Sequence, residues 1–167
     1  MVDQMLWLLG DVVEVWAELD EVTLPGGVTD SGFVVTMKHR SGVTSYVSSS
    51  KANHLASRQL RAYGALGSFE SNGTDVQAAA LFEGGRPVDD PSGWGYEDAS
   101  RLGVLHTSAG DVVVPSAQGN YAHFYEAFAR AVRGTGPAPS DAREGVKTLA
   151  VLDAARRSAR SGAWEKP

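Results

Sequence analysis

The side chains in this sequence that could perform acid–base chemistry or bind a metal are few and widely spaced. The four histidines form neither a close pair on one helix face nor a cysteine–histidine motif; they are His39, His54, His106 and His123. Zinc sites need such spacing, because several ligands must converge on one ion. The chain also has no cysteine, which excludes disulfides and thiolate ligands. We therefore expect no metal site in this chain.

An irregular region over residues 84–111 holds the side chains best suited to contact a small molecule. A stretch of this length without periodicity is typically functional or packs against a partner. Trp94 and Tyr96 could stack on a ring, or could only anchor the loop. His106 and His123 could face the same ligand, or could be ordinary packed or surface histidines.

Acidic residues of the same region leave open a small independent enzyme that uses carboxylates. These residues are Asp89, Asp90 and Glu97. A pair of carboxylates can serve as general acid and base. Acidic loop residues are more often simply hydrated, so the sequence favours the plainer interpretation.

The composition is that of a globular protein with a core of ordinary size. Hydrophobic residues make up 43% of the 167 residues. Acidic residues outnumber basic ones by 20 to 15, and the net charge of −5 argues against a nucleic-acid partner. The apolar run over residues 5–9 is too short to span a membrane. We therefore expect a cytoplasmic protein, which the lack of cysteine also fits.

The first ten residues have the pattern of a helix that ends but does not begin. Gly10 stands where a left-handed residue commonly closes a helix, and no capping side chain precedes the apolar stripe. Asp3 on this helix is either a functional carboxylate or a polar flank residue. The stripe consists of Val2, Met5, Leu6 and Leu9. We therefore expect the chain to be a piece of a longer protein.

Alternating patterns then predict a run of strands. The expected strands cover residues 11–20, 33–38, 43–48, 59–64, 68–71 and, more weakly because of its alanines, 75–83. A short turn at 39–42 should join the second and third of these as an antiparallel pair. A further short strand is expected over 111–114.

Two helices are predicted to close the chain. The first covers about 120–133, with an apolar stripe expected in the core: Tyr121, Phe124 and Phe128. The second begins after Asp141, where Glu144 completes the spacing of a capping box, and it ends at Gly162.

This order predicts an α+β fold. We expect a mostly antiparallel sheet of about six strands with helices packed on one face. The other face would be open for subunit pairing, and Tyr46 and Tyr63 are expected there.

Four segments, taken in order, carry a resemblance to a known family. Residues 2–10 match the end of a D-x-G-x-H-x-x-D-x-x-x-x-L-x-G motif, with Asp3 at its last aspartate. Residues 64–69 resemble a G-x-x-G-x-hydrophobic turn. Residues 120–134 resemble a Y-x-x-F-x-x-x-x-x-A-x-x-x-G helix, and residues 140–162 a final helix. Together they resemble the C-terminal domain of the Gfo/Idh/MocA oxidoreductases, relatives of glucose–fructose oxidoreductase and inositol dehydrogenase.

The resemblance implies a parent protein that transfers a hydride between NAD or NADP and a hydroxyl carbon of a sugar, polyol or similar small molecule. Residues 1–167 would form its single C-terminal substrate and oligomerisation domain. A homo-oligomer, dimer or tetramer, would form through the open sheet face. The candidate substrate-binding residues are then Asp3, Trp94, Tyr96, His106 and His123.

Several features of that family are missing from the chain. No G-x-G-x-x-G turn is present, and residues 93–95 (Gly-Trp-Gly) follow no predicted strand. The family's catalytic aspartate and histidine would precede Met1. Its catalytic lysine belongs to an E-K-P motif of the nucleotide-binding domain, and we interpret the same letters at 165–167 as coincidence. We therefore expect no catalytic residue, no cofactor site and no nucleotide-binding domain in this chain.

An alternative is a stand-alone α+β binding or assembly module without enzymatic activity. A native start codon at Met1 would favour this alternative. An upstream reading frame that encodes a glycine-rich βαβ domain would favour the oxidoreductase.

Overall fold

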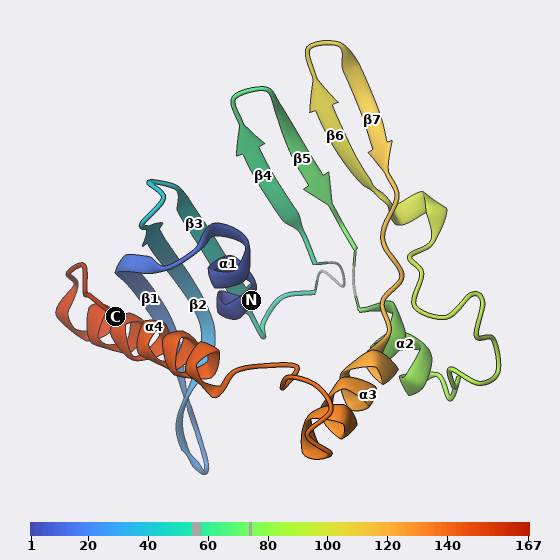
Figure 1. The fold of residues 1–167 in the computed structure, drawn as a ribbon. Helices are drawn as coiled ribbons and strands as arrows, with labels where there is room; N and C mark the ends of the chain where they lie inside the picture. Colours follow the sequence, from blue (N-terminus) through green and yellow to red (C-terminus); the bar gives the residue numbers. More distant parts are fainter. Residues whose placement is uncertain (55–57, 74) are drawn as a thin grey trace. The chain divides into compact units, whose positions relative to one another are not determined.

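The chain forms two compact units in a computed structural model that describes residues 1–54, 58–73 and 75–167 (Figure 1). Unit 1 comprises Met1–His54 and Ser140–Pro167, and unit 2 comprises Leu55–Pro139. Each unit contains its own antiparallel sheet. Within the described ranges, no helix is both long and apolar enough to cross a membrane.

Unit 1 is built around a long β-hairpin. β1 (Val12–Leu24) turns at Pro25 and Gly26 into β2 (Gly27–His39), and β3 (Thr44–Ser50) completes the order β1-β2-β3. The strands predicted over 11–20, 33–38 and 43–48 are confirmed. β1 and β2 extend further than predicted, because the Pro-Gly pair makes a tight turn and both strands continue up to it.

The core of unit 1 lies between this sheet and α4 (Ala142–Ser161), which packs against β1. β1 contributes Val15 and Ala17, both almost completely buried, as its alternating pattern predicts. The other buried hydrophobic residues are Val2, Val35, Met37, Val47, Val151, Ala154 and Ala155. Asp141 caps α4 by accepting a hydrogen bond from the Arg143 N–H, so the predicted start of this helix is confirmed.

A buried histidine connects α1 (Val2–Leu9) to the sheet. Gly10 ends α1 at the predicted position and has a positive φ of 83°, but its ψ of −169° is not that of the left-handed helical conformation. The Gly10 carbonyl accepts a hydrogen bond of 2.8 Å from Nδ1 of His39, which is 2% exposed. Because a carbonyl can only accept, Nδ1 carries the proton, and in the neutral ring Nε2 accepts from the Ser45 hydroxyl at 2.8 Å.

Unit 2 contains a four-stranded sheet in the order β4-β5-β6-β7, with every neighbouring pair antiparallel. The strands are β4 (Leu60–Gly64), β5 (Gly67–Ser71), β6 (Gly103–Thr107) and β7 (Gly110–Val114). The helices are α2 (Val76–Phe82), the short 3₁₀ helix η1 (Ala99–Arg101) and α3 (Tyr121–Val132). The strands predicted near 59–64, 68–71 and 111–114 are confirmed.

The α+β class is confirmed, but the prediction of one sheet of about six strands is wrong. The described residues form seven strands in two sheets. The expected strand over 75–83 is helix α2, because alanines favour a helix and the Asp75 side chain caps it through the Ala78 N–H. β6 was missed, since it lies inside the region predicted to be irregular.

The prediction that the aromatic stripe of α3 lies in the core is also wrong. Tyr121, Phe124 and Phe128 are 45%, 51% and 54% exposed. The rings of Phe124 and Phe128 stack on each other with centroids 6.4 Å apart. Helical spacing identified the stripe correctly, but spacing does not say what covers it.

Candidate functional site

Gln77 is the centre of the best-defined polar cluster in unit 2. Its side chain is 5% exposed, and its Oε1 accepts hydrogen bonds from Trp94 Nε1 at 3.1 Å and from the Tyr121 N–H at 3.0 Å. The Trp94 carbonyl accepts a further bond of 2.9 Å from the Gln118 amide. One buried amide oxygen therefore joins α2, the loop that carries Trp94 and the first turn of α3.

Two glycines allow this loop and the segment before α3 to approach each other closely. The Gly119 N–H donates to the Gly95 carbonyl at 2.8 Å. A Cβ on Gly95 would lie 1.8 Å from the Gly119 carbonyl oxygen, and Gly95 has a φ of +79°. Gly95 is therefore needed both for its backbone conformation and for the space it leaves.

The first turn of α3 presents two further polar side chains. Asn120 caps the helix by accepting from the Ala122 N–H at 2.9 Å. Its amide nitrogen lies 3.2 Å from Nε2 of His123. Because an amide nitrogen can only donate, Nε2 of His123 is the acceptor in this contact. The Tyr121 hydroxyl contacts the Asp75 carboxylate.

Among the predicted site residues, Trp94 is linked through Gln77 to the first turn of α3, the turn that also carries His123. Tyr96 follows Trp94 by two residues and is 50% exposed. Asp3 belongs to unit 1, where its Oδ1 accepts from the Thr148 hydroxyl of α4 at 3.2 Å. Sequence reasoning missed Gln77, because it fell within a segment predicted to be a strand.

His106 lies on β6 in the sheet of unit 2, and its ring contacts an acidic side chain on each of the two neighbouring strands. Its Nδ1 lies 2.8 Å from Asp111 on β7, and its Nε2 lies 3.5 Å from Glu70 on β5. The hydrogen bond to Asp111 is the main cause that raises the pKa of His106 above its ordinary value. Its polar contacts are thus with the strands and not with the cluster around Gln77.

The remaining histidines and the loop carboxylates do not assemble a metal centre. His54 is exposed and His39 is buried between Gly10 and Ser45. Asp89 pairs with Arg86, and Asp90 accepts from the Gly93 N–H, a bond that lowers the pKa of Asp90. In the part of the chain that the structure describes, no three acidic or histidine side chains converge as a metal site would require.

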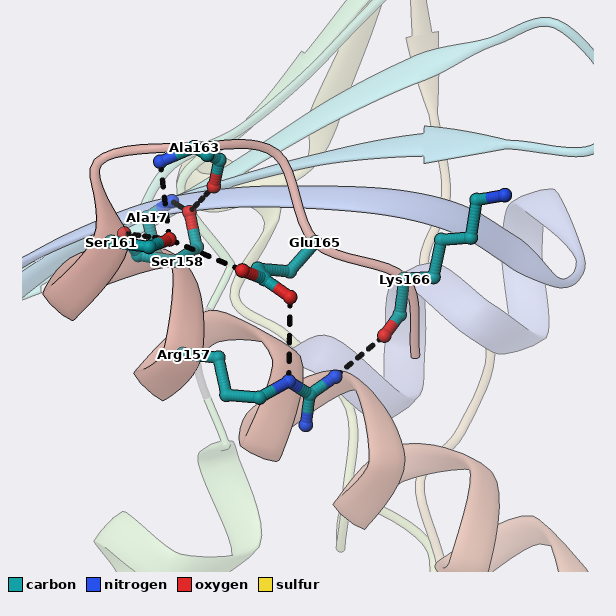
Figure 2. Close-up of polar contacts among 7 residues, drawn as sticks. All are labelled: Ala17, Arg157, Ser158, Ser161, Ala163, Glu165 and Lys166. Atoms are coloured by element: carbon teal, nitrogen blue, oxygen red, sulfur yellow. Dashed lines mark hydrogen bonds and ion pairs between the residues drawn. The ribbon is translucent and has the colours of Figure 1, made fainter.

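A second polar network, in unit 1, surrounds Ser158 and the C-terminal tail (Figure 2). Ser158 is completely buried; its hydroxyl accepts from the Ala17 N–H at 3.0 Å and donates to the Ala163 carbonyl at 2.6 Å. Arg157 donates to the Lys166 carbonyl at 2.6 Å. The backbone of Glu165 pairs with Val15 of β1. The E-K-P letters therefore belong to a segment that is bound along the sheet.

Comparison with known proteins identifies the family of this chain. Residues 1–166 match the family model for the C-terminal alpha/beta domain of the Gfo/Idh/MocA oxidoreductase family. Scyllo-inositol 2-dehydrogenase (NADP(+)) IolW of Bacillus subtilis (strain 168) is 31% identical over 102 residues, which are 59% of this chain and 28% of that protein.

Solved structures agree over nearly the whole chain. A candidate oxidoreductase of Bacteroides fragilis NCTC 9343 superposes with a TM-score of 0.83 at 27% identity, covering 99% of this chain and 50% of that one. An oxidoreductase of Agrobacterium radiobacter, in complex with NAD+, L-tartaric acid and magnesium, shares the fold with a TM-score of 0.68 at 15% identity, covering 99% and 46%. The chain thus spans half, or less, of these relatives. The match over residues 1–166 shows that it belongs to the Gfo/Idh/MocA oxidoreductase family, as its C-terminal alpha/beta domain.

Proposed function

We propose that this chain is the substrate-binding and subunit-pairing domain of an NAD(P)-dependent oxidoreductase that acts on a hydroxyl group of a sugar, a polyol or a similar small molecule. The family match over residues 1–166 is the observation that carries the proposal. The name of the B. subtilis relative, an NADP(+)-dependent inositol dehydrogenase, supports a polyol substrate and a nicotinamide cofactor. In such a reaction the nicotinamide accepts the hydride, and the protein positions the reacting carbon.

The described residues do not fit a dinucleotide site. Such a site needs a glycine-rich turn between a strand and a helix, so that backbone N–H groups can face the pyrophosphate. Gly93 and Gly95 lie in a loop, and the Gly93 N–H is already bonded to the Asp90 carboxylate at 2.9 Å. That negative charge would repel a phosphate. We therefore propose that the dinucleotide binds to another domain and that this chain alone does not catalyse.

The start of α3 is the surface that we propose faces the substrate. It combines the Trp94 ring with polar groups of Asn120 and His123, and all three side chains are at least partly accessible. A polyol presents both C–H faces and hydroxyl groups, so it needs an aromatic surface and hydrogen-bonding groups together. Tyr96 and His106 remain candidates within unit 2, and Asp3 of unit 1 remains a candidate by its sequence position alone.

Ligand-observed NMR with scyllo-inositol and D-glucose tests the substrate-binding role. We expect weak saturable binding to the purified chain, weakened about tenfold by Trp94→Ala or His123→Ala. His54→Ala serves as the control, because His54 is exposed and lies outside the cluster. If neither compound binds, or if all three variants bind alike, the proposed substrate surface is wrong.

Calorimetry and an absorbance assay test the catalytic role. We expect no micromolar binding of NAD(H) or NADP(H), and no reduction of either nucleotide by the chain with a polyol. Oxidation of any polyol by the isolated chain would contradict the proposal that it is not catalytic by itself.

We further propose that the chain self-associates through its sheets. Tyr46 on β3 and Tyr63 on β4 are 73% and 79% exposed, each on a sheet of its unit. On the sheet of unit 1, Tyr46 lies in one cross-strand row with Trp16 and Thr36. Light scattering should show a dimer or tetramer that Tyr46→Glu weakens. A strict monomer at high concentration would overturn this proposal.

A further inference from the structure

The C-terminal tail shows how the outer edge of β1 binds an extended segment. The Val15 N–H donates to the Glu165 carbonyl, and the Glu165 N–H donates to the Val15 carbonyl, both at 2.8 Å. The Glu165 carboxylate lies 3.5 Å from the Arg157 guanidinium of α4 (Figure 2). Recognition of the tail therefore combines backbone pairing on β1 with a carboxylate–arginine contact on α4.

Beyond Ala17, no segment among the described residues pairs with the same edge. In an antiparallel ladder the N–H groups of successive residues point alternately to the two sides of the strand. Val15 and Ala17 donate outward, to the tail and to Ser158, so Leu19 is the next residue to face outward. Leu24 and Gly27 are the pair that closes the tight turn. Counting back along β1 from this pair, the N–H groups of Thr23 and Glu21 also point outward. In the described ranges no strand pairs with this side of β1.

A pocket of about 400 Å³ lies along this free stretch. Its lining residues come from β1, β2 and α4: Leu19, Glu21, Asp30, Arg156, Ala159 and Arg160. Arg156 is paired with Asp153 at 3.1 Å. Arg160 forms no ion pair with any residue of the described parts of the chain. The pocket thus repeats the combination that binds the tail, an outward-facing backbone beside an arginine of α4.

We propose that the edge of β1 from Leu19 to Thr23 binds an extended segment of another polypeptide, which carries an acidic and a basic side chain two residues apart, so that both lie on the same face of the added strand. The segment adds to β1 as a further strand. Its carboxylate pairs with Arg160, and its basic side chain lies beside Glu21 and Asp30. The charges of the pocket favour such an occupant, because two carboxylates and Arg160, which has no ion-pair partner among the described residues, line the same space together with Arg156, which is paired with Asp153.

A second copy of this chain fits the edge poorly. Two copies related by a two-fold axis would pair β1 with β1 in an antiparallel manner. A pairing centred on Glu21 places Glu21 opposite its own symmetry mate, and like charges in that position are destabilising. A pairing centred on Leu19 places Glu21 opposite Ala17, whose N–H is already bonded to Ser158. These two registers count against a second copy, and the charges of the pocket lead us to propose a different chain as the occupant.

Amide chemical shifts of the full chain, titrated with the peptide acetyl-Thr-Lys-Val-Glu-Thr-amide, test the proposal. We expect saturable shifts at Leu19, Glu21 and Thr23. Arg160→Gln should weaken binding about tenfold. The matched control is Arg143→Gln, because Arg143 lies at the first turn of the same helix and pairs with Asp141 outside the pocket.

Two N-methylated versions of the peptide separate strand addition from simple charge attraction. Each version blocks one alternating set of its N–H groups, and only the version whose methyl groups face β1 should lose binding. The proposal is overturned by an absence of saturable shifts at millimolar peptide, or by equal binding of both methylated peptides. Shifts at the same amides that depend on protein concentration alone would assign the edge to a second copy, and would overturn it too. None of these outcomes depends on the proposed oxidoreductase function.

Discussion

Replacing Ser158 with alanine tests whether one buried hydroxyl holds α4 and the tail to β1. The change leaves the Ala17 N–H without its acceptor, and Ala17 is only 2% exposed, so water cannot replace the lost bond. The Ala163 carbonyl also loses a donor, but Ala163 is exposed and water can take that place. An unsatisfied buried N–H costs about 1–3 kcal/mol. We therefore expect the free energy of unfolding of unit 1 to fall by about 1–3 kcal/mol.

Urea unfolding together with hydrogen exchange at the Ala17 amide measures this effect. Exchange reports the local bond directly, because Ser158 is the acceptor of that N–H. The matched control is Ser49→Ala on β3, whose side chain is exposed and which should stay within about 0.5 kcal/mol of the original chain. The reasoning is refuted if Ser158→Ala changes the stability no more than the control does and the Ala17 amide stays protected.

Three further predictions concern two glycines and one histidine. Gly95→Ala should lower the stability of unit 2 by more than about 1 kcal/mol in urea unfolding, because the added Cβ would lie 1.8 Å from the Gly119 carbonyl oxygen. Gly145→Ala should raise the stability by about 1 kcal/mol in the same assay, because a Cβ there meets no atom within 4 Å in the interior of α4. The folded-state pKa of His106 is raised, so its stabilising contribution is complete below the pKa of the unfolded chain and disappears as the pH rises through the folded-state value. NMR titration should show that Asp111→Asn lowers the pKa of His106, and an unchanged value would contradict the role of Asp111.

Local chemistry made the fold of unit 1 largely predictable from its sequence. Alternation identified the buried face of β1, and Gly10 and Asp141 marked a helix end and a helix start that the structure confirms. The prediction of a strand over 75–83 was wrong for a physical reason. The apolar residues of this segment are compatible with both the helical and the strand period. The alanines and the Asp75 cap favour the helix that the structure shows.

The candidate site was less predictable, because its central residue has no local signature. Gln77 binds partners 17 and 44 residues away along the chain, and no periodicity reports such contacts.

The hydrogen bonds within the cluster limit which groups of Trp94 and His123 can contact a ligand. The Trp94 indole N–H is used by Gln77, so Trp94 can meet a ligand only through its ring. Nε2 of His123 is engaged by Asn120, which leaves Nδ1 to contact a hydroxyl group. A polyol bound at the start of α3 would therefore be held by stacking on Trp94 and by one donated hydrogen bond from His123, and His123 would orient the ligand and not remove its proton.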